Sequence, residues 1–350
     1  MSLTSKLQLI KQDVNRARSA ITEMGGSVTT NGGTSQLEDD IKTIPVTLGM
    51  MREISQDGIY RVPVTPFTFR IPDNAKNMDE NSIRYGFYKS AGLTSVVLDS
   101  IEEISGDYAM NYTFFQCPNL VDVDLRSLET VSGNNSMSFG FLGCESLKTL
   151  NLSGLKDVTG SNAMASCFRQ CPSIEQVNMP NLETVGDYTA TSAETNMSYC
   201  FYQCPSIEQV NMPKLKSVGY SAFLNAFQSC TSLLSIDVSS LEKIGKSGFA
   251  NAFQLCSSIQ TVSFNKLNKI DRNGLSNTFR GCASLKTMYF PSLDNDSFLG
   301  ATSGSNMGQM LLGVTGCTVH LPAILNNTIR NLSFIRNGFS GTNTTILYDL

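Results

Sequence analysis

The motif Phe-x-x-Cys recurs seven times along the middle of this 350-residue chain. Its copies begin at Phe114, Phe141, Phe168, Phe201, Phe227, Phe253 and Phe279. They lie 27, 27, 33, 26, 26 and 26 residues apart, and a near-constant period in this range is typical of a solenoid, in which each repeat buries its apolar face against its neighbours. The motif therefore predicts one long repeat body, although the length alone would suit two average domains.

Each repeat also carries apolar positions with the period of a strand. After the second motif they are Leu147, Leu150 and Leu152, and polar Thr149 and Asn151 alternate with the last two. Alternation of this kind predicts a strand with one buried face. The same positions stay apolar in every other copy, so we expect the strands to stack in parallel.

Two further segments complete the predicted repeat. A Leu-x-x-Val or Leu-x-x-Ile pattern, as at Leu128 and Val131, predicts a second short extended segment. Met137, Phe141 and Cys144 lie at i, i+4 and i+7, and this spacing predicts a short helix with one face inward. The predicted class is therefore an α/β repeat solenoid.

The repeat pattern has two ends. An incomplete copy begins at Phe87, with Ser90 in the Cys position, and the pattern stops where Asp296 replaces the Val or Ile expected after Leu293. We therefore expect about eight repeats, and residues 317–322 predict one more strand at the edge of the sheet. The chain then divides into a helical N-terminal segment, an N-terminal capping region, the solenoid and a C-terminal cap, at residues 1–48, 49–85, 86–300 and 301–350.

The repeats resemble a known family, the bacterial surface-antigen type of leucine-rich repeat called BspA-like. The match is seen in Met179-Pro180, Leu182/Val185-Gly186 and Phe201-x-x-Cys204. The likeness implies a right-handed array of parallel strands and a non-enzymatic binding or adhesion module, often on bacterial surfaces and also in parasitic protists. The repeat here is longer than the family's usual unit, and no secretion signal pattern precedes it.

The first residues carry an apolar seam. Apolar residues three or four positions apart, the spacing of a coiled coil, run over three heptads at Leu3, Leu7, Ile10, Val14, Ala17, Ile21 and Met24. Such a seam would make the chain a homo-oligomer through Leu3, Leu7, Ile10, Val14 and Ile21. In the alternative, two helices fold back on the first repeat as a cap. The termini also resemble structural proteins of phage tails and prophages of gut bacteria.

Composition argues against several partners. The net charge is −4, only 16% of the residues are charged, and there is no basic run, so nothing predicts binding to nucleic acid or to an anionic membrane. The sequence has neither a run of 18 apolar residues nor a signal-peptide pattern, and we therefore expect no membrane insertion. The sequence leaves the location open: the BspA-like resemblance implies a cell surface, and the resemblance of the termini to phage proteins implies a virion.

Seven of the ten cysteines occupy one position of the repeat. We expect buried free thiols that pack as small apolar groups, because side chains stacked at about 4.8 Å are poorly oriented for disulfides. Cys167, Cys171, Cys200 and Cys204 form C-x-x-x-C twice, which leaves a zinc site open as an alternative. His320 is the single histidine and no phosphate-binding loop is found, so we expect neither enzyme activity nor a cofactor.

The outward positions of the predicted strands form a polar stripe. Carboxylate and amide groups there are suited to hydrogen-bond a glycan or a peptide, at Asp122, Asp124, Asn151, Gln176, Asn178, Gln209, Asn211, Asp237 and Tyr289. In the alternative, the stripe is a solvated face. The lack of aromatic residues apart from Tyr289 counts against sugar binding.

The fourth repeat has surplus residues at 187–195. Insertions in a solenoid emerge as loops and often bind ligands, so Tyr188 joins the candidate site residues. Residues 170–180 and 203–213 are identical, and this identity offers another explanation, a duplication whose junction kept extra residues.

These patterns predict a non-catalytic recognition or adhesion protein that binds a protein or a glycan through its sheet face and the loop at 187–195. The alternative is a structural spacer, a tail-associated component of a phage or prophage particle, that oligomerises through residues 1–45.

Overall fold

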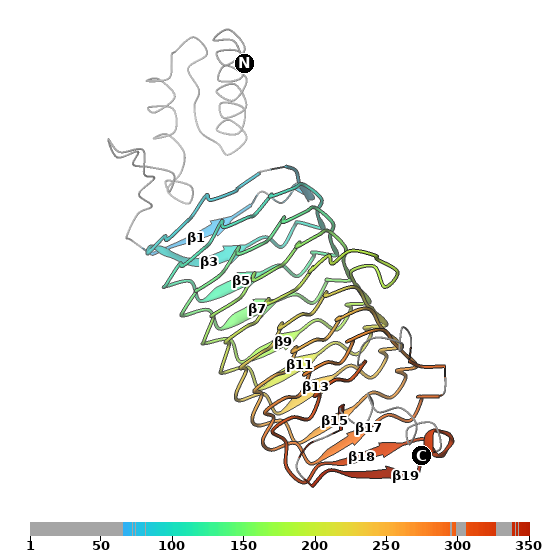
Figure 1. The fold of residues 1–350 in the computed structure, drawn as a ribbon. Helices are drawn as coiled ribbons and strands as arrows, with labels where there is room; N and C mark the ends of the chain where they lie inside the picture. The colour runs from blue at the N-terminus through green and yellow to red at the C-terminus, as the bar shows by residue number, and fades with distance from the viewer. Residues whose placement is uncertain are drawn as a thin grey trace, which may run out of the picture. The chain divides into compact units, whose positions relative to one another are not determined.

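The chain falls into two compact units in the computed structural model (Figure 1). The described residues are 66–71, 73, 75–80, 82–294, 296–298, 306–326, 338–339, 341 and 343–350. Of these, 66–69 and 90–93 belong to the smaller unit, in which the backbone N–H of Phe67 donates to the carbonyl of Gly92 at 2.9 Å. The predicted helical segment 1–48, with its oligomerisation seam, lies outside the described residues.

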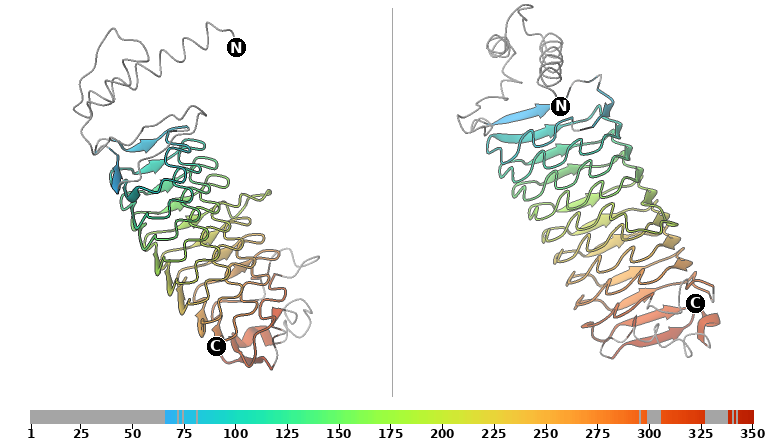
Figure 2. Two further views of the ribbon diagram at one scale, coloured as in Figure 1. Left: turned by 90° about the vertical axis from the view of Figure 1, so that its left-hand side faces the viewer. Right: turned by 45° about the horizontal axis from the view of Figure 1, so that its top comes forward.

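The larger unit is a stack of coils, and each coil contributes one short strand to its first side (Figures 1 and 2). These strands are β3 (Leu93–Val97), β5 (Asp122–Asp124), β7 (Thr149–Asn151), β9 (Gln176–Asn178), β11 (Gln209–Asn211), β13 (Ser235–Asp237), β15 (Thr261–Ser263), β17 (Thr287–Tyr289), β18 (Thr318–Leu321) and β19 (Thr345–Tyr348). Strand β1 (Phe67–Arg70) belongs mainly to the smaller unit. Pairing is parallel and in register, so Val123 lies beside Leu150 and Val177 beside Val210. The predicted strands are confirmed.

Hydrogen bonding divides this first side into three groups, β3-β5-β7, β9-β11-β13 and β15-β17-β18-β19. Among the described strands, no ladder joins β7 to β9 or β13 to β15. The strand predicted at 317–322 is confirmed as β18, but its edge position is wrong, because β17 and β19 pair on its two sides. The count of about eight repeats is too low for the same reason, since β18 and β19 extend the stack to about ten coils.

The second side is a continuous sheet of two-residue strands, in which each strand pairs in parallel with those of the coils before and after it. They are β2 (Asn77–Met78), β4 (Glu103–Ile104), β6 (Thr130–Val131), β8 (Asp157–Val158), β10 (Thr184–Val185), β12 (Ser217–Val218), β14 (Lys243–Ile244) and β16 (Lys269–Ile270). The second residue of every strand is an apolar side chain that is buried. The second extended segment predicted from Leu-x-x-Val/Ile is thereby confirmed.

The third side consists of successive turns, where short helices were predicted. Along these turns, the backbone N–H groups alternate between an acceptor in the same coil and an acceptor in the next coil. Gly140 donates to Met137 three residues back at 3.0 Å, whereas Phe139 donates to Ala165 of the next coil, also at 3.0 Å. An α-helix would direct both to the residue four positions back. The turns instead tie each coil to the next, as the two sheets do.

Backbone dihedrals explain why a helix cannot form on this side. Every fourth residue has positive φ, as in Asn135 (52°), Phe139 (57°) and Gly143 (71°), and an α-helix needs negative φ throughout. Turns that repeat every four residues bring Met137 and Phe141 inward as a helix would, so spacing alone did not separate the two. The predicted α/β class is wrong: the fold is a parallel β-solenoid, and the one helix with assigned bounds among the described residues is the 3-10 helix η2 (Ala323–Leu325).

A column of stacked phenylalanine rings fills the interior. Neighbouring ring centroids are 4.8–5.7 Å apart, with interplanar angles of 5–17°. The rings belong to Phe87, Phe114, Phe141, Phe168, Phe201, Phe227, Phe253 and Phe279, all of them buried. Stacking of buried aromatic rings adds to their apolar burial, which explains why Phe recurs at this position.

The cysteine of each motif lies beside this column. Its thiol donates to the carbonyl oxygen of the phenylalanine in the preceding coil, at 3.1–3.3 Å in all seven copies. The predicted burial is confirmed. The thiol is more than a small apolar group, however, because it links one coil to the coil before it.

Candidate functional site

All nine residues of the predicted stripe lie on the first side of the solenoid. Gln176 pairs with Gln209, and Asn178 pairs with Asn211. The two interruptions of the sheet separate these amides from the carboxylates before them and from Tyr289 after them. The structure therefore brings the stripe together in three groups instead of one continuous surface.

The carboxylates of Asp122 and Asp124 already have hydrogen-bond partners within the protein. Asp124 is only 7% exposed, and Nε of Arg126 donates to its two oxygens at 2.8 and 3.0 Å. Asp122 accepts a hydrogen bond from the Ser95 hydroxyl at 3.4 Å, and burial raises the pKa of Asp122 above its ordinary value. Asp124 is thus a partner of Arg126, a residue that the sequence prediction did not include.

Three stripe side chains also close the turn that follows their strand. The Oδ1 atom accepts a hydrogen bond from the backbone N–H two residues later, at 3.0–3.1 Å, in Asp124, Asn151 and Asp237. Asn and Asp favour such turns for this reason. The preference for these residues at the strand ends therefore has a structural cause that is independent of any ligand.

A hollow of about 340 Å³ opens in the stripe between β7 and β9. Asn151, Gln176 and Asn178 line it, and Nζ of Lys148 lies 3.9 Å from Oε1 of Glu175 at its margin. Amide groups from two coils face the same space here, at the point where the sheet is interrupted. A small ligand placed in this hollow would meet amide groups from both coils.

Tyr289 lies apart from that hollow, near the C-terminal end. Its ring stacks on His320 with centroids 4.6 Å apart, and Nδ1 of His320 lies 2.9 Å from a carboxylate oxygen of Asp349. One face of the tyrosine ring is therefore covered by the histidine. The structure does not bring Tyr289 together with the amide groups.

The insertion at 187–195 is held by its own side chains and lies beside the second side. The backbone N–H and the hydroxyl of Thr189 donate to Asp187 at 2.7 and 2.8 Å, and these bonds lower the pKa of Asp187. Tyr188 is half-buried, 6.0 Å from Nζ of Lys243 in β14, and burial raises its pKa. Tyr188 is therefore not part of the same site as the stripe.

An aromatic surface on the third side was missed by the sequence analysis. One column of outward rings contains Tyr85, Tyr112 and Phe139, whose centroids are 5.4 and 4.7 Å apart, and a second contains Tyr88 and Phe115, 4.9 Å apart. The period of 27 residues within each column is the signal that could have revealed it, because it equals the period of the inner phenylalanines.

Cationic side chains lie against this aromatic surface. The guanidinium carbon of Arg84 is 5.1 Å from the ring centroid of Tyr85 and 4.5 Å from that of Tyr108, and Nζ of Lys89 is 5.4 Å from that of Tyr88. The three tyrosines are 49%, 36% and 40% exposed, respectively. The aromatic surface comprises Arg84, Tyr85, Tyr88, Lys89, Tyr108, Tyr112, Phe115 and Phe139.

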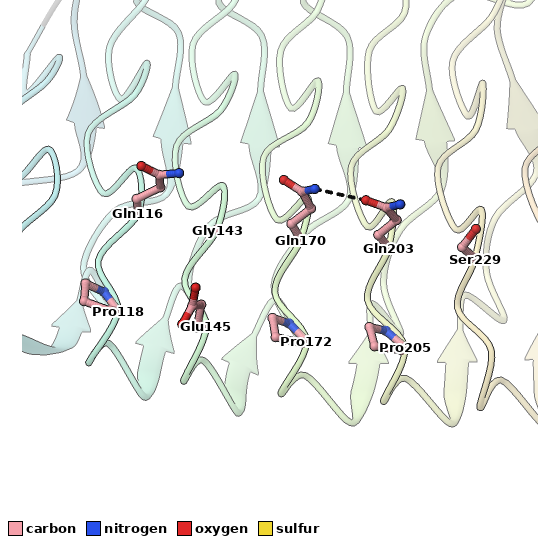
Figure 3. A pocket seen from close by; sticks show the side chains of 9 residues that line it. All are labelled: Gln116, Pro118, Gly143, Glu145, Gln170, Pro172, Gln203, Pro205 and Ser229. Atoms are coloured by element: carbon pink, nitrogen blue, oxygen red, sulfur yellow. Dashed lines mark hydrogen bonds between the residues drawn. The ribbon is translucent and has the colours of Figure 1, made fainter.

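A groove of about 830 Å³ follows the same side across several coils (Figure 3). It is lined by Gln116, Pro118, Gly143, Glu145, Gln170, Pro172, Gln203, Pro205 and Ser229. Nε2 of Gln170 donates to Oε1 of Gln203 at 3.0 Å. The sequence signal was Gln-Cys-Pro, which occurs at 116–118, 170–172 and 203–205.

The repeats also match a known family at the sequence level. The sequence model of the BspA type leucine rich repeat region, in six copies, matches residues 68–223 and 194–301, well over half of the chain. The chain belongs to the BspA type leucine-rich-repeat family. The resemblance drawn from the repeat residues is confirmed, and repeat proteins of the BspA type are generally non-catalytic.

Solved structures similar to this BspA-type chain are also leucine-rich repeat proteins. A leucine-rich repeat protein from Bacteroides ovatus is 18% identical, covers 85% of this chain and 97% of its own, and has a TM-score of 0.27. A leucine rich cell surface protein from Faecalibacterium prausnitzii is 15% identical, with coverages of 83% and 91% and a TM-score of 0.29. No curated protein sequence gives a significant match.

The cysteines of the BspA-type coils are part of the packed interior. All ten cysteines are buried and free, and burial raises the pKa of Cys200, Cys230 and Cys282 to about 12. Metal ligation requires the thiolate. In the described part of the chain, no cluster of His, Cys, Asp or Glu is arranged to hold a metal ion, and no helix there has the length and apolarity to cross a bilayer.

Proposed function

We propose that this BspA-type solenoid is a recognition protein that binds a protein partner through the aromatic surface. One observation carries the proposal: stacked tyrosines lie exposed beside Arg84 and Lys89. Tyrosine and arginine are enriched at the centres of protein interfaces, where they contribute much of the binding energy. A large exposed aromatic patch on a folded protein is also unusual without a partner.

Ring stacking prepares the surface for binding. Because the ring of Tyr85 stacks on Tyr112 and that of Tyr112 on Phe139, fewer rotamers remain to be lost when a partner docks. The ring faces meet one another, so edges and hydroxyl groups point outward. Burial, with the nearby Tyr85 and Tyr88, raises the pKa of Tyr112 above its ordinary value. Near neutral pH the hydroxyl of a tyrosine is protonated with or without this shift, so Tyr112 can donate a hydrogen bond.

Charge favours an acidic partner segment. Arg84 and Lys89 lie over tyrosine rings, and aromatic ring edges are themselves positive. A carboxylate on the partner would meet both kinds of group at once. We therefore expect the bound segment to combine acidic side chains with apolar ones.

The hollow in the polar stripe is a second proposed site, for a protein or a glycan, and its converging amides support it. Frequent surface association of BspA-type proteins supports a location at a cell surface. The rival role as a spacer in a phage particle depends on residues 1–45, which lie outside the described residues. It stays a prediction from sequence.

The test is selection of a phage-displayed library of random peptides on the full chain. Enriched peptides are then measured against a variant with Tyr85→Ser, Tyr88→Ser and Tyr108→Ser. A matched control carries Asn151→Ala, Asn178→Ala and Asn211→Ala on the stripe. We expect acidic, apolar peptides that lose at least about tenfold in affinity with the tyrosine variant and keep it with the stripe variant.

Two results would contradict this assignment. Peptides that bind the tyrosine variant as well as the original chain would remove the aromatic surface from consideration. Loss of binding in the stripe variant alone would move the site to the hollow between β7 and β9. Circular dichroism of both variants would verify that the solenoid remains folded.

A further inference from the structure

The groove on the third side repeats its chemistry from coil to coil. Backbone hydrogen bonds join each coil to the next at this level, as from Gln116 to Leu142 at 2.7 Å and from Gly143 to Arg169 at 2.9 Å. Equivalent residues therefore recur at strand spacing, about 4.8 Å. The two walls are the column Gln116, Gly143, Gln170, Gln203 and Ser229 and the column Pro118, Glu145, Pro172 and Pro205 (Figure 3).

The two walls differ in polarity. Glutamine amides carry both donors and acceptors, and the side chains of Gln116, Gln170 and Gln203 are exposed. The hydrogen bond between Gln170 and Gln203 uses only one N–H and one oxygen of that pair. The opposite wall presents proline rings, which are apolar. The groove is thus amphipathic along its length, with Glu145 as its one charged lining residue.

Gly143 interrupts the column of side chains in the amide wall. Its φ is +71°, and a Cβ atom there would lie 3.1 Å from Cγ of Gln116 and 3.9 Å from Nε2 of Gln116. Because Gly143 has no side chain, the side chain of Gln116 lies against this coil. Glu145 lines the groove at the same coil, in the proline wall. A ring-shaped group bound at this coil would meet the amide of Gln116 on one wall and the carboxylate of Glu145 on the other.

We infer that this groove binds a neutral, linear polysaccharide lying along the stack of coils. Sugar hydroxyls both donate and accept hydrogen bonds, as the amides do. The polar stripe has no apolar wall, and its lack of aromatic residues apart from Tyr289 counts against sugar binding there. In this groove, by contrast, the proline rings offer an apolar wall to the C–H faces of the sugar rings. A repeating ligand also suits a repeating wall, because the length of one pyranose unit is close to the spacing of the coils. This inference is independent of the aromatic surface and of its protein partner.

Other polymers fit the groove less well. In an extended peptide, side chains on one face recur at about 6.6 Å, which does not match the coil spacing. Proline-rich peptides bind in grooves with aromatic walls, and no aromatic residue is among those that line this groove. Polyanions need a cluster of cations, whereas the charged group here is a carboxylate.

The experiment is calorimetric titration of the full chain with soluble linear oligosaccharides of glucose, mannose and N-acetylglucosamine, each in a series of increasing length. The variant Gln170→Ala/Gln203→Ala removes amides from the groove. Its matched control, Gln254→Ala/Gln260→Ala, removes two glutamine side chains that do not line the groove. A third variant, Gly143→Asn, introduces a side chain that displaces Gln116, in a residue that tolerates positive φ.

We expect affinity in at least one series to rise with length until the ligand spans the groove. It should fall about tenfold in Gln170→Ala/Gln203→Ala, fall also in Gly143→Asn, and stay unchanged in the control. The inference would be overturned if no oligosaccharide bound, or if the control lost binding to the same extent as Gln170→Ala/Gln203→Ala.

Discussion

Two kinds of aromatic column run through the same coils, one inside the solenoid and one on its surface. The inner column holds Phe in eight successive coils, from Phe87 to Phe279. The outer column begins with Tyr85, Tyr112 and Phe139, and then the equivalent residues become Ser166, Tyr199, Asn225, Asn251 and Asn277. A position that is constant in every coil serves packing, whereas a position that changes after three coils serves something local.

The backbone makes this contrast sharper. All residues of the outer column have φ of 53–58°, a conformation that Asn tolerates and bulky residues avoid. The asparagines of the later coils are what this backbone favours. Aromatic residues in the first coils oppose the local preference, and departures of this kind concentrate at functional sites. This argument supports the aromatic surface as a binding site.

Alkaline pH should lower the free energy of unfolding through the buried cysteines that lie beside the inner column. This is the largest effect that we expect. The pKa of Cys230 is raised from about 9 to about 12. The unfolded chain therefore loses this proton first. The free energy of unfolding is at its full value below about pH 9 and falls as the pH rises toward 12, by about 1.4 kcal/mol per thiol and pH unit. Urea unfolding at a series of alkaline pH values measures the fall.

Two variants refine the alkali experiment. Cys230→Ala should reduce the slope of the unfolding free energy against pH by the share of one thiol, whereas Tyr85→Phe on the outer surface should not reduce it by that amount. An identical slope in Cys230→Ala and in the original chain would mean that the buried thiols do not cause the alkaline loss of stability.

A pair of substitutions in a single coil compares the two columns directly. Phe141 is fully buried in the inner column, and Phe139 is half-exposed in the outer one. Phe141→Ala should lower the free energy of unfolding by about 3–5 kcal/mol, because it leaves a cavity between stacked rings. Phe139→Asn introduces the residue found in later coils and should cost less than about 1 kcal/mol. Urea denaturation of both variants measures the difference, and equal losses would refute the division into inner and outer columns.

Much of the solenoid could be predicted from the sequence, because burial on alternate residues marks a strand directly. The apolar repeat positions at Leu147, Leu150 and Leu152 predicted the strands of the first side. The fixed period of the repeats predicted the register of these strands. The turns of the third side could not be separated from helices in this way, since Met137 and Phe141 have a spacing that suits both. Asn and Gly at every fourth outward position, as at Asn135 and Gly143, would have favoured turns with positive φ.

The candidate surfaces were harder to predict than the fold. The polar stripe was found because strand alternation assigns outward positions, yet its interruption between β7 and β9 depends on packing that no single repeat reveals. The aromatic surface and the groove lie on the side whose backbone was misassigned. Their members, such as Tyr112 and Gln116, were therefore never placed on a common face, although each recurs with the period of the coils.

The smallest effect that we expect comes from a test of the backbone conformation in the outer column. Asn251 has φ of 55° and lies in a coil where the outer column is no longer aromatic. Asn251→Val should lower the free energy of unfolding by about 1–2 kcal/mol, because a β-branched residue is strained at positive φ. Asn251→Gly should change the free energy of unfolding by only a few tenths of a kcal/mol, roughly, because glycine adopts positive φ readily. Thermal or urea denaturation distinguishes them. If valine were tolerated as well as glycine, the backbone would not favour Asn at this position. The aromatic residues of the first coils would then oppose no local preference, and their case as a binding surface would depend on exposure alone.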